Sequence, residues 1–306
     1  MKIFILSPNK DAVFTEELIK ELGTVGDVHF ETKPKSFEDI SELLESNDKI
    51  IAADPDFFDW KFPNEIIDKV PDIKAICLQT TSFSWIDVAY AKQKGIPVTN
   101  LRGFSTEAVA EYALLMTLGA ARKFAQVIKD DFKQDFIKHR GVELKGKKVG
   151  IIGLGQIGKR YAELMAGVGA EVVYWSKNSR NERLKFIDLD KLFSEADIIF
   201  PALAYNDDTS KLISDDLLTR MKPNAIFVSI VHKIYNHELV LKLAEEGKIF
   251  GYAFEEENGN PTKHQGNVLA LPSIAWATDG SMRSNGEMWT EAIINATKEN
   301  FSTRVN

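Results

Sequence analysis

A glycine-rich turn is the feature of this 306-residue sequence best suited to chemistry. Gly153, Gly155 and Gly158 follow an apolar run at residues 149–152 and precede a helical pattern that starts near Lys159. In this spacing the first glycine makes the turn, the second lets a pyrophosphate approach the backbone, and the third lets helix and strand pack closely. A helix N-terminus also attracts phosphate. The turn therefore predicts a dinucleotide site, with a tight turn that binds nothing as the alternative.

The residues after the next strand pattern indicate which dinucleotide binds. About 20 residues beyond the glycines, a carboxylate would hold the ribose 2′-hydroxyl of NAD. Here the chain carries Ser176, Lys177 and Arg180, and no acid that would repel a 2′-phosphate. One hydroxyl and two cations could bind that phosphate. We expect NADP(H) to be preferred, while NAD(H) stays possible because both cations could be ordinary solvated charges.

Short apolar runs alternate with helical patterns over most of the chain, which is typical of a parallel α/β sheet. The strands expected in the first hundred residues are 3–6, 28–30, 50–53, 73–78 and 96–99, with helical patterns at 14–22, 37–44 and 86–94. The strands expected later are 149–152, 171–175, 198–201, 225–230, 249–254 and 268–271. The residues from Gly286 onward have helical character, and they could fold back onto the first domain.

Residues 106–121 have almost no polar face. Such a helix is expected to be buried on all sides, between two domains or two subunits. The length of the chain suggests two domains. We place the seam between them near residue 100, so that this helix opens the second domain.

Composition and charge exclude several classes of protein. The formal net charge is −7 and no run of basic residues could follow a phosphate backbone, so we expect no nucleic-acid partner. Cys77 is the only cysteine, which rules out an internal disulfide and cysteine-based metal clusters and suits a reducing cytoplasm. His232 and His237 are five residues apart and make a poor metal site. No apolar span reaches the roughly 18 residues of a membrane helix, so no membrane anchor is expected.

Several stretches carry a resemblance to a known family. They are Thr99-Asn100 with residues 103–111, residues 143–152 leading into the glycine turn, and residues 221–225. Over almost the whole chain the sequence resembles the D-isomer-specific 2-hydroxyacid dehydrogenases. The residues after the second strand of the expected cofactor domain are similar to those of the NADP-using glyoxylate and hydroxypyruvate reductases in that family.

The resemblance implies an α/β fold of two domains. A Rossmann dinucleotide-binding domain would span residues 100–284, and a flavodoxin-like substrate domain would span residues 1–99 and be completed by residues 285–306. It also implies an active site between the domains, a small-molecule substrate, and a homodimer built on the apolar helix. Cofactor contacts are implied for Thr106, Gln156 and Ile157 in addition to the three glycines.

The catalytic positions implied by the resemblance are partly altered. The family uses an arginine to bind the substrate carboxylate, a histidine to donate a proton, and a glutamate to raise the pKa of that histidine. His232 stands where the arginine belongs, Ser273 stands where the histidine belongs, and the glutamate maps onto Glu257. A serine hydroxyl holds its proton too tightly to replace an imidazole, so His232 or Lys233 would take over acid or carboxylate duty with Glu257 as charge partner.

Substrate contacts are implied for the loop around residues 80–85. Ser82, Phe83 and Trp85 lie there. The expected cleft is aromatic, because it would contain Phe83, Trp85, Tyr252 and Trp276. We predict an NAD(P)-dependent oxidoreductase that reduces a 2-oxo acid or similar carbonyl with a rewired catalytic set. Two alternatives stay open. The protein could bind a dinucleotide without redox chemistry, in sensing or assembly, or its cleft could take a carboxylate-free substrate or catalyse a non-redox reaction.

Overall fold

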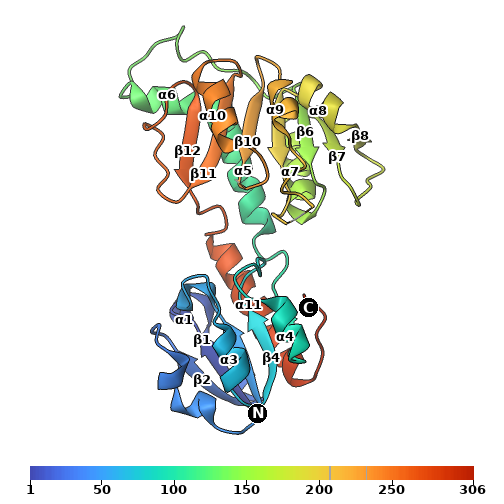
Figure 1. The fold of residues 1–306 in the computed structure, drawn as a ribbon. Helices are drawn as coiled ribbons and strands as arrows, with labels where there is room; N and C mark the ends of the chain where they lie inside the picture. Colours follow the sequence, from blue (N-terminus) through green and yellow to red (C-terminus); the bar gives the residue numbers. More distant parts are fainter. Residues whose placement is uncertain (207, 232) are drawn as a thin grey trace. The chain divides into compact units, whose positions relative to one another are not determined.

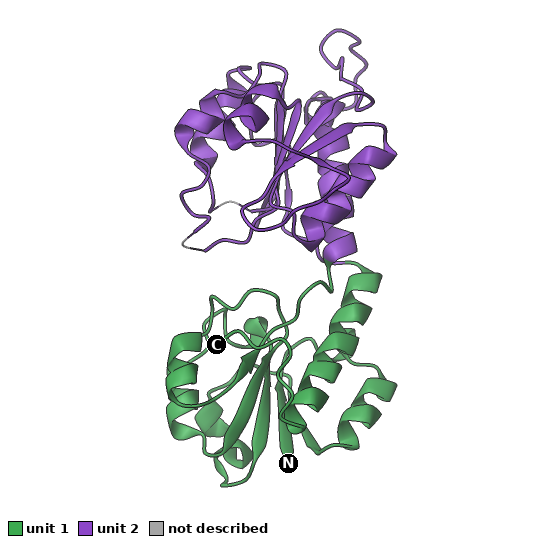
Figure 2. Cartoon of the chain, turned by 90° about the vertical axis from the view of Figure 1, so that its right-hand side faces the viewer, with its two compact units in different colours: residues 1–105, 278–306 green, residues 106–277 purple. Residues whose placement is uncertain are grey.

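The computed structural model describes residues 1–206, 208–231 and 233–306 and divides them into two units. Unit 1 contains residues 1–105 and 278–306, and unit 2 contains residues 106–277 (Figures 1 and 2). These borders lie a few residues from the expected seams at 99/100 and 284/285. The reason is that helix α5 (Thr106–Ala121) begins at the first border and helix α11 (Asp279–Thr297) begins next to the second, and each helix packs as one body.

Unit 1 is a parallel five-stranded sheet in the order β2-β1-β3-β4-β5, which is the flavodoxin-like order. Its strands are β1 (Lys2–Leu6), β2 (Asp27–Glu31), β3 (Lys49–Ala53), β4 (Ile73–Leu78) and β5 (Val98–Thr99). Its other helices are α1 (Lys10–Val13), α2 (Glu16–Gly23), α3 (Asn64–Lys69) and α4 (Val88–Gln93). The sequence predicts each strand to within about two residues, because all of them except the half-buried β2 are short, mostly apolar runs buried in the sheet.

Two segments of unit 1 are a pair of 3₁₀ turns and the C-terminal helix. The helix expected at residues 37–44 is instead two 3₁₀ turns, Phe37–Asp39 and Ser41–Leu44, because Ile40 between them adopts non-helical angles. Helix α11 packs on β3, β4 and α2, where the buried indole of Trp289 donates to the carbonyl of Cys77 at 3.0 Å. The C-terminal helix thus belongs to the first unit, as expected.

Unit 2 is a parallel seven-stranded sheet in the order β12-β11-β10-β9-β6-β7-β8. The strands are β6 (Lys148–Ile152), β7 (Glu171–Trp175), β8 (Lys185–Phe186), β9 (Ile198–Pro201), β10 (Ile226–Ser229), β11 (Gly251–Glu256) and β12 (Val268–Pro272). The remaining helices are α6 (Phe124–Lys129), α7 (Gln156–Gly167), α8 (Leu189–Glu195), α9 (Asp215–Thr219) and α10 (His237–Glu245). The strand order reverses at β6, as in a Rossmann fold, where ligands bind beyond the carboxyl ends of the strands.

Helix α5 is buried on one side only within its unit. Ala110, Ala113 and Met116 are fully buried in the core beneath the sheet, and the helix contacts α7, β10 and β11. Leu115 and Leu118 on the other side are 54% and 41% exposed. Unit 2 by itself therefore leaves one side of the helix uncovered, and burial of that side between two domains or two subunits stays a prediction.

No helix in the described parts of the chain is both long enough and apolar enough to cross a membrane. Among the same residues, no group of three or more His, Cys, Asp and Glu side chains is placed to hold a metal ion.

Candidate dinucleotide-binding and active site

The glycine turn between β6 and α7 has the geometry that a pyrophosphate needs. Gly153 has a φ of 96°, which disfavours other residues, and a Cβ on Gly158 would collide with the carbonyl oxygen of Gly153. Gly155 is the N-cap of α7, no side chain caps the helix there, and a Cβ at this position would have no neighbour within 4 Å. The backbone N–H groups at the start of this 12-residue helix therefore have no side-chain cap, and there is open space beside them. These residues fit a dinucleotide.

The other implied cofactor contacts lie around the same helix. Gln156 is its first residue and is exposed, and Ile157 is half-buried beside it. Thr106 begins α5, and its neighbour Glu107 accepts two hydrogen bonds from Arg160 of α7, at 2.6 and 2.7 Å. The structure therefore brings the start of α5 to the N-terminal half of α7. The contact of Thr106 with a cofactor stays a prediction.

The turn after β7 is held together by its own residues. Ser176 is buried and its hydroxyl oxygen accepts from the N–H of Ser179 at 3.1 Å. Arg180 donates to the carbonyls of Ser176 and Ser179 at 2.9 and 3.0 Å, and its guanidinium lies 5.1 Å from the ring centroid of Phe186. The turn thus places a hydroxyl and a guanidinium at the carboxyl end of β7.

Lys177, in the same turn, has a partner that the local sequence did not reveal. Its Nζ lies 3.0 Å from a carboxylate oxygen of Asp208, in the loop after β9, and both side chains are exposed. An exposed ion pair of this kind is worth about 0–1 kcal/mol, so a 2′-phosphate could displace it at little cost. Residues 175–180 contain no acid, but in the folded chain Asp208 lies beside this turn. The expectation that no acid is close to the 2′-phosphate position is therefore wrong.

The ends of β9 and β10 bring Tyr205 and Lys233 together. The ammonium of Lys233 lies 5.9 Å from the ring centroid of Tyr205, and both residues are exposed. Lys233 is thus a cation at the carboxyl edge of the sheet. His232, its neighbour in the predicted catalytic set, lies outside the described residues.

A buried carboxyl group lies at the end of β11. Glu255 is 7% exposed, and its Oε1 accepts from the N–H of Ala275 at 2.9 Å. Burial raises the pKa of this carboxyl, although hydrogen bonds from the backbone of Ala275 and Ile274 act in the opposite direction. Tyr112 of α5 donates to the carbonyl of Pro272 at 2.9 Å, and burial together with the charge of Glu255 raises the pKa of its phenol to about 12.

Sequence reasoning missed both Glu255 and Tyr112. The available signal was an acid that directly continues the apolar run of β11, where a buried strand would otherwise carry an apolar residue. The predicted positions Glu257 and Ser273 are exposed. They follow the ends of two paired strands, in which Glu256 lies opposite Pro272, so the structure brings them to the same edge of the sheet. Their catalytic roles stay predictions.

Two aromatic residues expected in the cleft differ in position. Trp276 is 46% exposed and follows β12 near the end of unit 2. Tyr252 is fully buried, and its hydroxyl shares hydrogen bonds with Tyr235 at 2.6 Å and with Nδ1 of His237 at 2.7 Å. Tyr252 therefore fills the core beside α10, and the expectation that it lines a cleft is wrong.

The predicted substrate loop of unit 1 follows β4. Trp85 is buried against Phe58 and Phe62, and its indole N–H lies within hydrogen-bond distance of the carbonyl of Ser82, at 3.0 Å. Ser82 and Phe83 are exposed. The buried Trp85 thus anchors this loop to the core of unit 1. The contact of Ser82, Phe83 and Trp85 with substrate stays a prediction.

Comparisons with known proteins agree with this geometry. The family model for the NAD-binding domain of D-isomer specific 2-hydroxyacid dehydrogenases matches residues 114–277. A protein of Staphylococcus haemolyticus named as a 2-hydroxyacid dehydrogenase is 32% identical over 70% of this chain and 72% of its own. A glyoxylate reductase of Thermofilum pendens is 28% identical over 85% of this chain and 81% of its own.

A solved structure of an acyclic imino acid reductase in complex with NADPH and D-Arg covers the whole of both chains, with a TM-score of 0.85 and 23% identity, which is a likeness of fold. The α/β fold and the dinucleotide-binding unit expected from the sequence are confirmed. Because the family model matches more than half of the chain, this protein belongs to the D-isomer specific 2-hydroxyacid dehydrogenase family, whose members are oxidoreductases that act on the CH–OH group of 2-hydroxyacids.

Proposed function

We propose that this protein is an NADPH-linked reductase that converts the carbonyl of a 2-oxo acid or a similar compound into a hydroxyl group, with a rewired catalytic set. The observation that carries the proposal is the open cradle at Gly155, on the same sheet edge as the exposed Ser273, the residue that the resemblance assigns to the position of the usual proton donor. Membership of the family supports an NAD(P)-dependent oxidoreductase. We further propose that NADPH is preferred and that other residues replace the family's catalytic arginine and histidine.

The cofactor preference rests on the turn after β7. Ser176 and Arg180 are placed there by backbone hydrogen bonds, and Lys177 is held only by an exposed ion pair. A 2′-phosphate would gain two cations and a hydroxyl at this turn. NAD(H) lacks that phosphate and would use only the cradle at the start of α7. We therefore propose that NADPH binds more tightly.

We assign a separate role in the reaction to the cofactor and to each of three residues. A bound nicotinamide dinucleotide would supply a hydride. Lys233 is an exposed cation that can bind a substrate carboxylate, and the hydroxyl of Ser273 can donate a hydrogen bond to a substrate oxygen. Glu257 would act as charge partner to the cations of this edge. Ser82, Phe83, Trp85 and Trp276 are proposed to contact the substrate.

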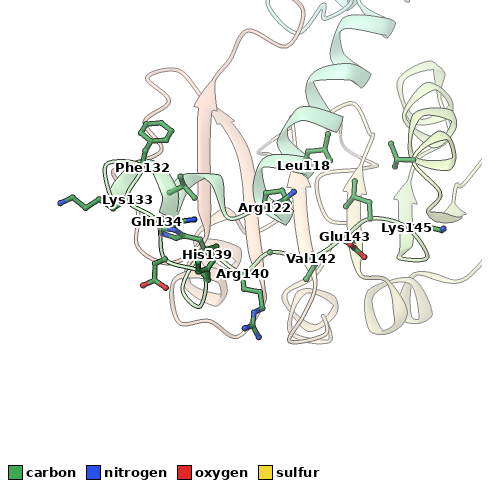
Figure 3. A pocket seen from close by; sticks show the side chains of 16 residues that line it. Leu118, Arg122, Phe132, Lys133, Gln134, His139, Arg140, Val142, Glu143 and Lys145 are labelled. Atoms are coloured by element: carbon green, nitrogen blue, oxygen red, sulfur yellow. The ribbon is translucent and has the colours of Figure 1, made fainter.

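We also propose a homodimer built on the exposed side of α5. That side borders a groove of about 1130 Å³, and Figure 3 shows Leu118 of α5 and Phe132 of the loop after α6 among its lining residues. Phe136 and Ile137 in this loop are 77% and 80% exposed. Apolar surface of this kind is usually covered by a partner.

A second copy of the chain is the partner that the groove's own charges favour. Its lining contains cations at Arg122, Lys133 and Lys145 and anions at Asp135 and Glu143. In a twofold dimer the same patch faces itself, so a patch with both signs of charge can form ion pairs with its copy. We propose a cytoplasmic location, because the single cysteine, Cys77, is free and buried.

The experiment that tests the function is a substrate panel. Purified protein is mixed with NADPH or NADH and with glyoxylate, hydroxypyruvate, pyruvate, aldehydes and ketones, and oxidation of the cofactor is followed by its absorbance. Each 2-oxo acid is also tested with ammonia or a primary amine, because the imino acid reductase shares this fold. The control is Gly155→Val, whose side chain would fill the cradle.

We expect NADPH oxidation with at least one carbonyl compound in the absence of amine, and none with the Gly155→Val variant. If NADPH binds but no compound is reduced, the proposal fails and the non-redox alternatives take its place.

A further inference from the structure

The buried carboxyl of Glu255 is a reactive group that the predicted catalytic set leaves unused. It lies at the end of β11 opposite Leu271 of β12, at the edge of the sheet where ligands of this fold bind. Hydrogen bonds from the backbone N–H groups of Ala275 and Ile274 attach it to the segment that directly follows Ser273. Glu255 is therefore held beside the position from which the family's proton donor is missing.

The surroundings of Glu255 favour a carboxyl group that keeps its proton. Burial raises its pKa and outweighs the backbone hydrogen bonds that stabilise the carboxylate. Helix α5 contributes Tyr112, whose own pKa is raised in part by the charge of Glu255. No charged side chain of the described residues contributes to the shift in the pKa of Glu255.

The titratable groups of α10 lie elsewhere. His237 and Glu238 are beside Tyr252, whose ring belongs to the core on the α10 side of the sheet, whereas Tyr112 reaches Glu255 from α5. The pKa of Glu255 is thus raised by burial, and no ion pair of the described residues lowers it.

We propose that Glu255 is the acid that gives a proton to the substrate oxygen during reduction, in place of the missing histidine; this rests on the proposed function. The carbonyl carbon receives a hydride, that is two electrons, from the reduced dinucleotide, and the carbonyl oxygen receives the proton of Glu255. The products are an alcohol, the oxidised dinucleotide and the Glu255 carboxylate. Water returns a proton to this carboxylate after the reaction.

The first test uses Glu255→Gln, which keeps an oxygen to accept from Ala275 and removes the acidic proton. We expect kcat for reduction to fall by about 10²-fold or more, with a smaller change in KM. Glu255→Asp should recover part of the activity. Glu256→Gln is the matched control, because this neighbour is paired with Lys263 at 3.3 Å, and it should stay near full activity.

The pH profile separates a proton donor from a group that only holds the loop. Reduction needs the protonated acid, which is present below its pKa, so kcat should fall as pH rises through the pKa of Glu255. This decline should be absent from the residual activity of Glu255→Gln. If Glu255→Gln keeps near-full activity, or if His232→Gln and not Glu255→Gln removes the decline, the proposal is overturned.

A second test needs no turnover. An oxidised nicotinamide ring is positively charged and would favour the Glu255 carboxylate, whereas the reduced ring is neutral. The affinity for oxidised relative to reduced cofactor should therefore rise with pH, about tenfold per unit between the pKa values of Glu255 in the two complexes. Fluorescence titrations at several pH values measure this ratio, which should not vary in Glu255→Gln.

The two tests distinguish the two possible failures. A ratio that rises with pH only when Glu255 is present, without any reduced substrate, would support the acid at this site and refute the proposed reductase. Turnover with a ratio that is independent of pH in the unmodified protein would support the reductase and overturn the role of Glu255.

Discussion

Ser176 is the residue at which the choice of cofactor can be reversed. In Ser176→Asp the new carboxylate can still accept from the N–H of Ser179, so the turn should persist. It would repel a 2′-phosphate, and we expect NADPH affinity to fall at least about tenfold while NADH affinity is kept or rises. Titration of both cofactors measures the change. Asn178→Asp, an exposed neighbour in the same turn, is the charge-matched control and should have a smaller effect.

The unmodified protein provides the decisive comparison for this prediction. If it binds NADH as well as NADPH, or better, then Lys177 and Arg180 are ordinary surface charges and the assignment of NADPH is incorrect.

Restoring the family residues at two positions should restore activity on simple 2-oxo acids. A positioned proton donor contributes about 10²–10⁴ in rate, and a bidentate arginine orients the carboxylate. We therefore expect kcat/KM for glyoxylate and pyruvate to be low and to increase when Ser273→His is combined with His232→Arg, more than in either single variant. Steady-state kinetics measure this. Turnover of pyruvate by the unmodified protein at about ten per second, near the median enzyme rate, would mean that the catalytic positions are mapped wrongly.

The connection between β6 and α7 allows the roles of two glycines to be separated at the level of the element. Gly158→Ala places a methyl group against the carbonyl of Gly153, which is backbone and cannot move aside, so unit 2 should lose about 1–3 kcal/mol of stability. Gly155→Ala meets no neighbour and has an ordinary φ of −74°, so it should keep its melting temperature while its cofactor affinity falls. Thermal melts and cofactor titrations of the pair measure both effects.

Each variant controls for the other, because both add one methyl group to the same turn. Undiminished cofactor binding by Gly155→Ala would show that the pyrophosphate does not approach this backbone.

For the whole molecule, the exposed side of α5 predicts a dimer. Light scattering at micromolar concentration should give twice the mass of one chain. Leu118→Glu should give a folded monomer, since its side chain is 41% exposed and adds little to the core of unit 2, with a melting temperature that no longer depends on protein concentration. Leu44→Glu, at an exposed apolar position of unit 1, is the matched control and should stay a dimer. A monomer for the unmodified protein would contradict the proposal.

Local pattern was enough to predict most of the strands and the glycine turn. Strands such as β4 could be located from sequence because a short apolar run between turn residues has few other ways to be buried. The glycine turn could be identified because its requirements are local, since the backbone itself binds the phosphate. Strand β8 was missed because its two residues, Lys185 and Phe186, are exposed and form no apolar run.

The tertiary structure decided which side chains meet. Lys177 and Asp208 are 31 positions apart, and Tyr112 and Pro272 are 160 apart, so no local pattern could reveal either pair. Tyr252 and Glu255 both lie on β11, yet one fills the core and the other reaches the candidate site, because that depends on which helix covers each face of the sheet. The sequence by itself determined the backbone cradle that is proposed to bind the cofactor, whereas the burial that raises the pKa of Glu255 arises only from the packing of elements distant in sequence.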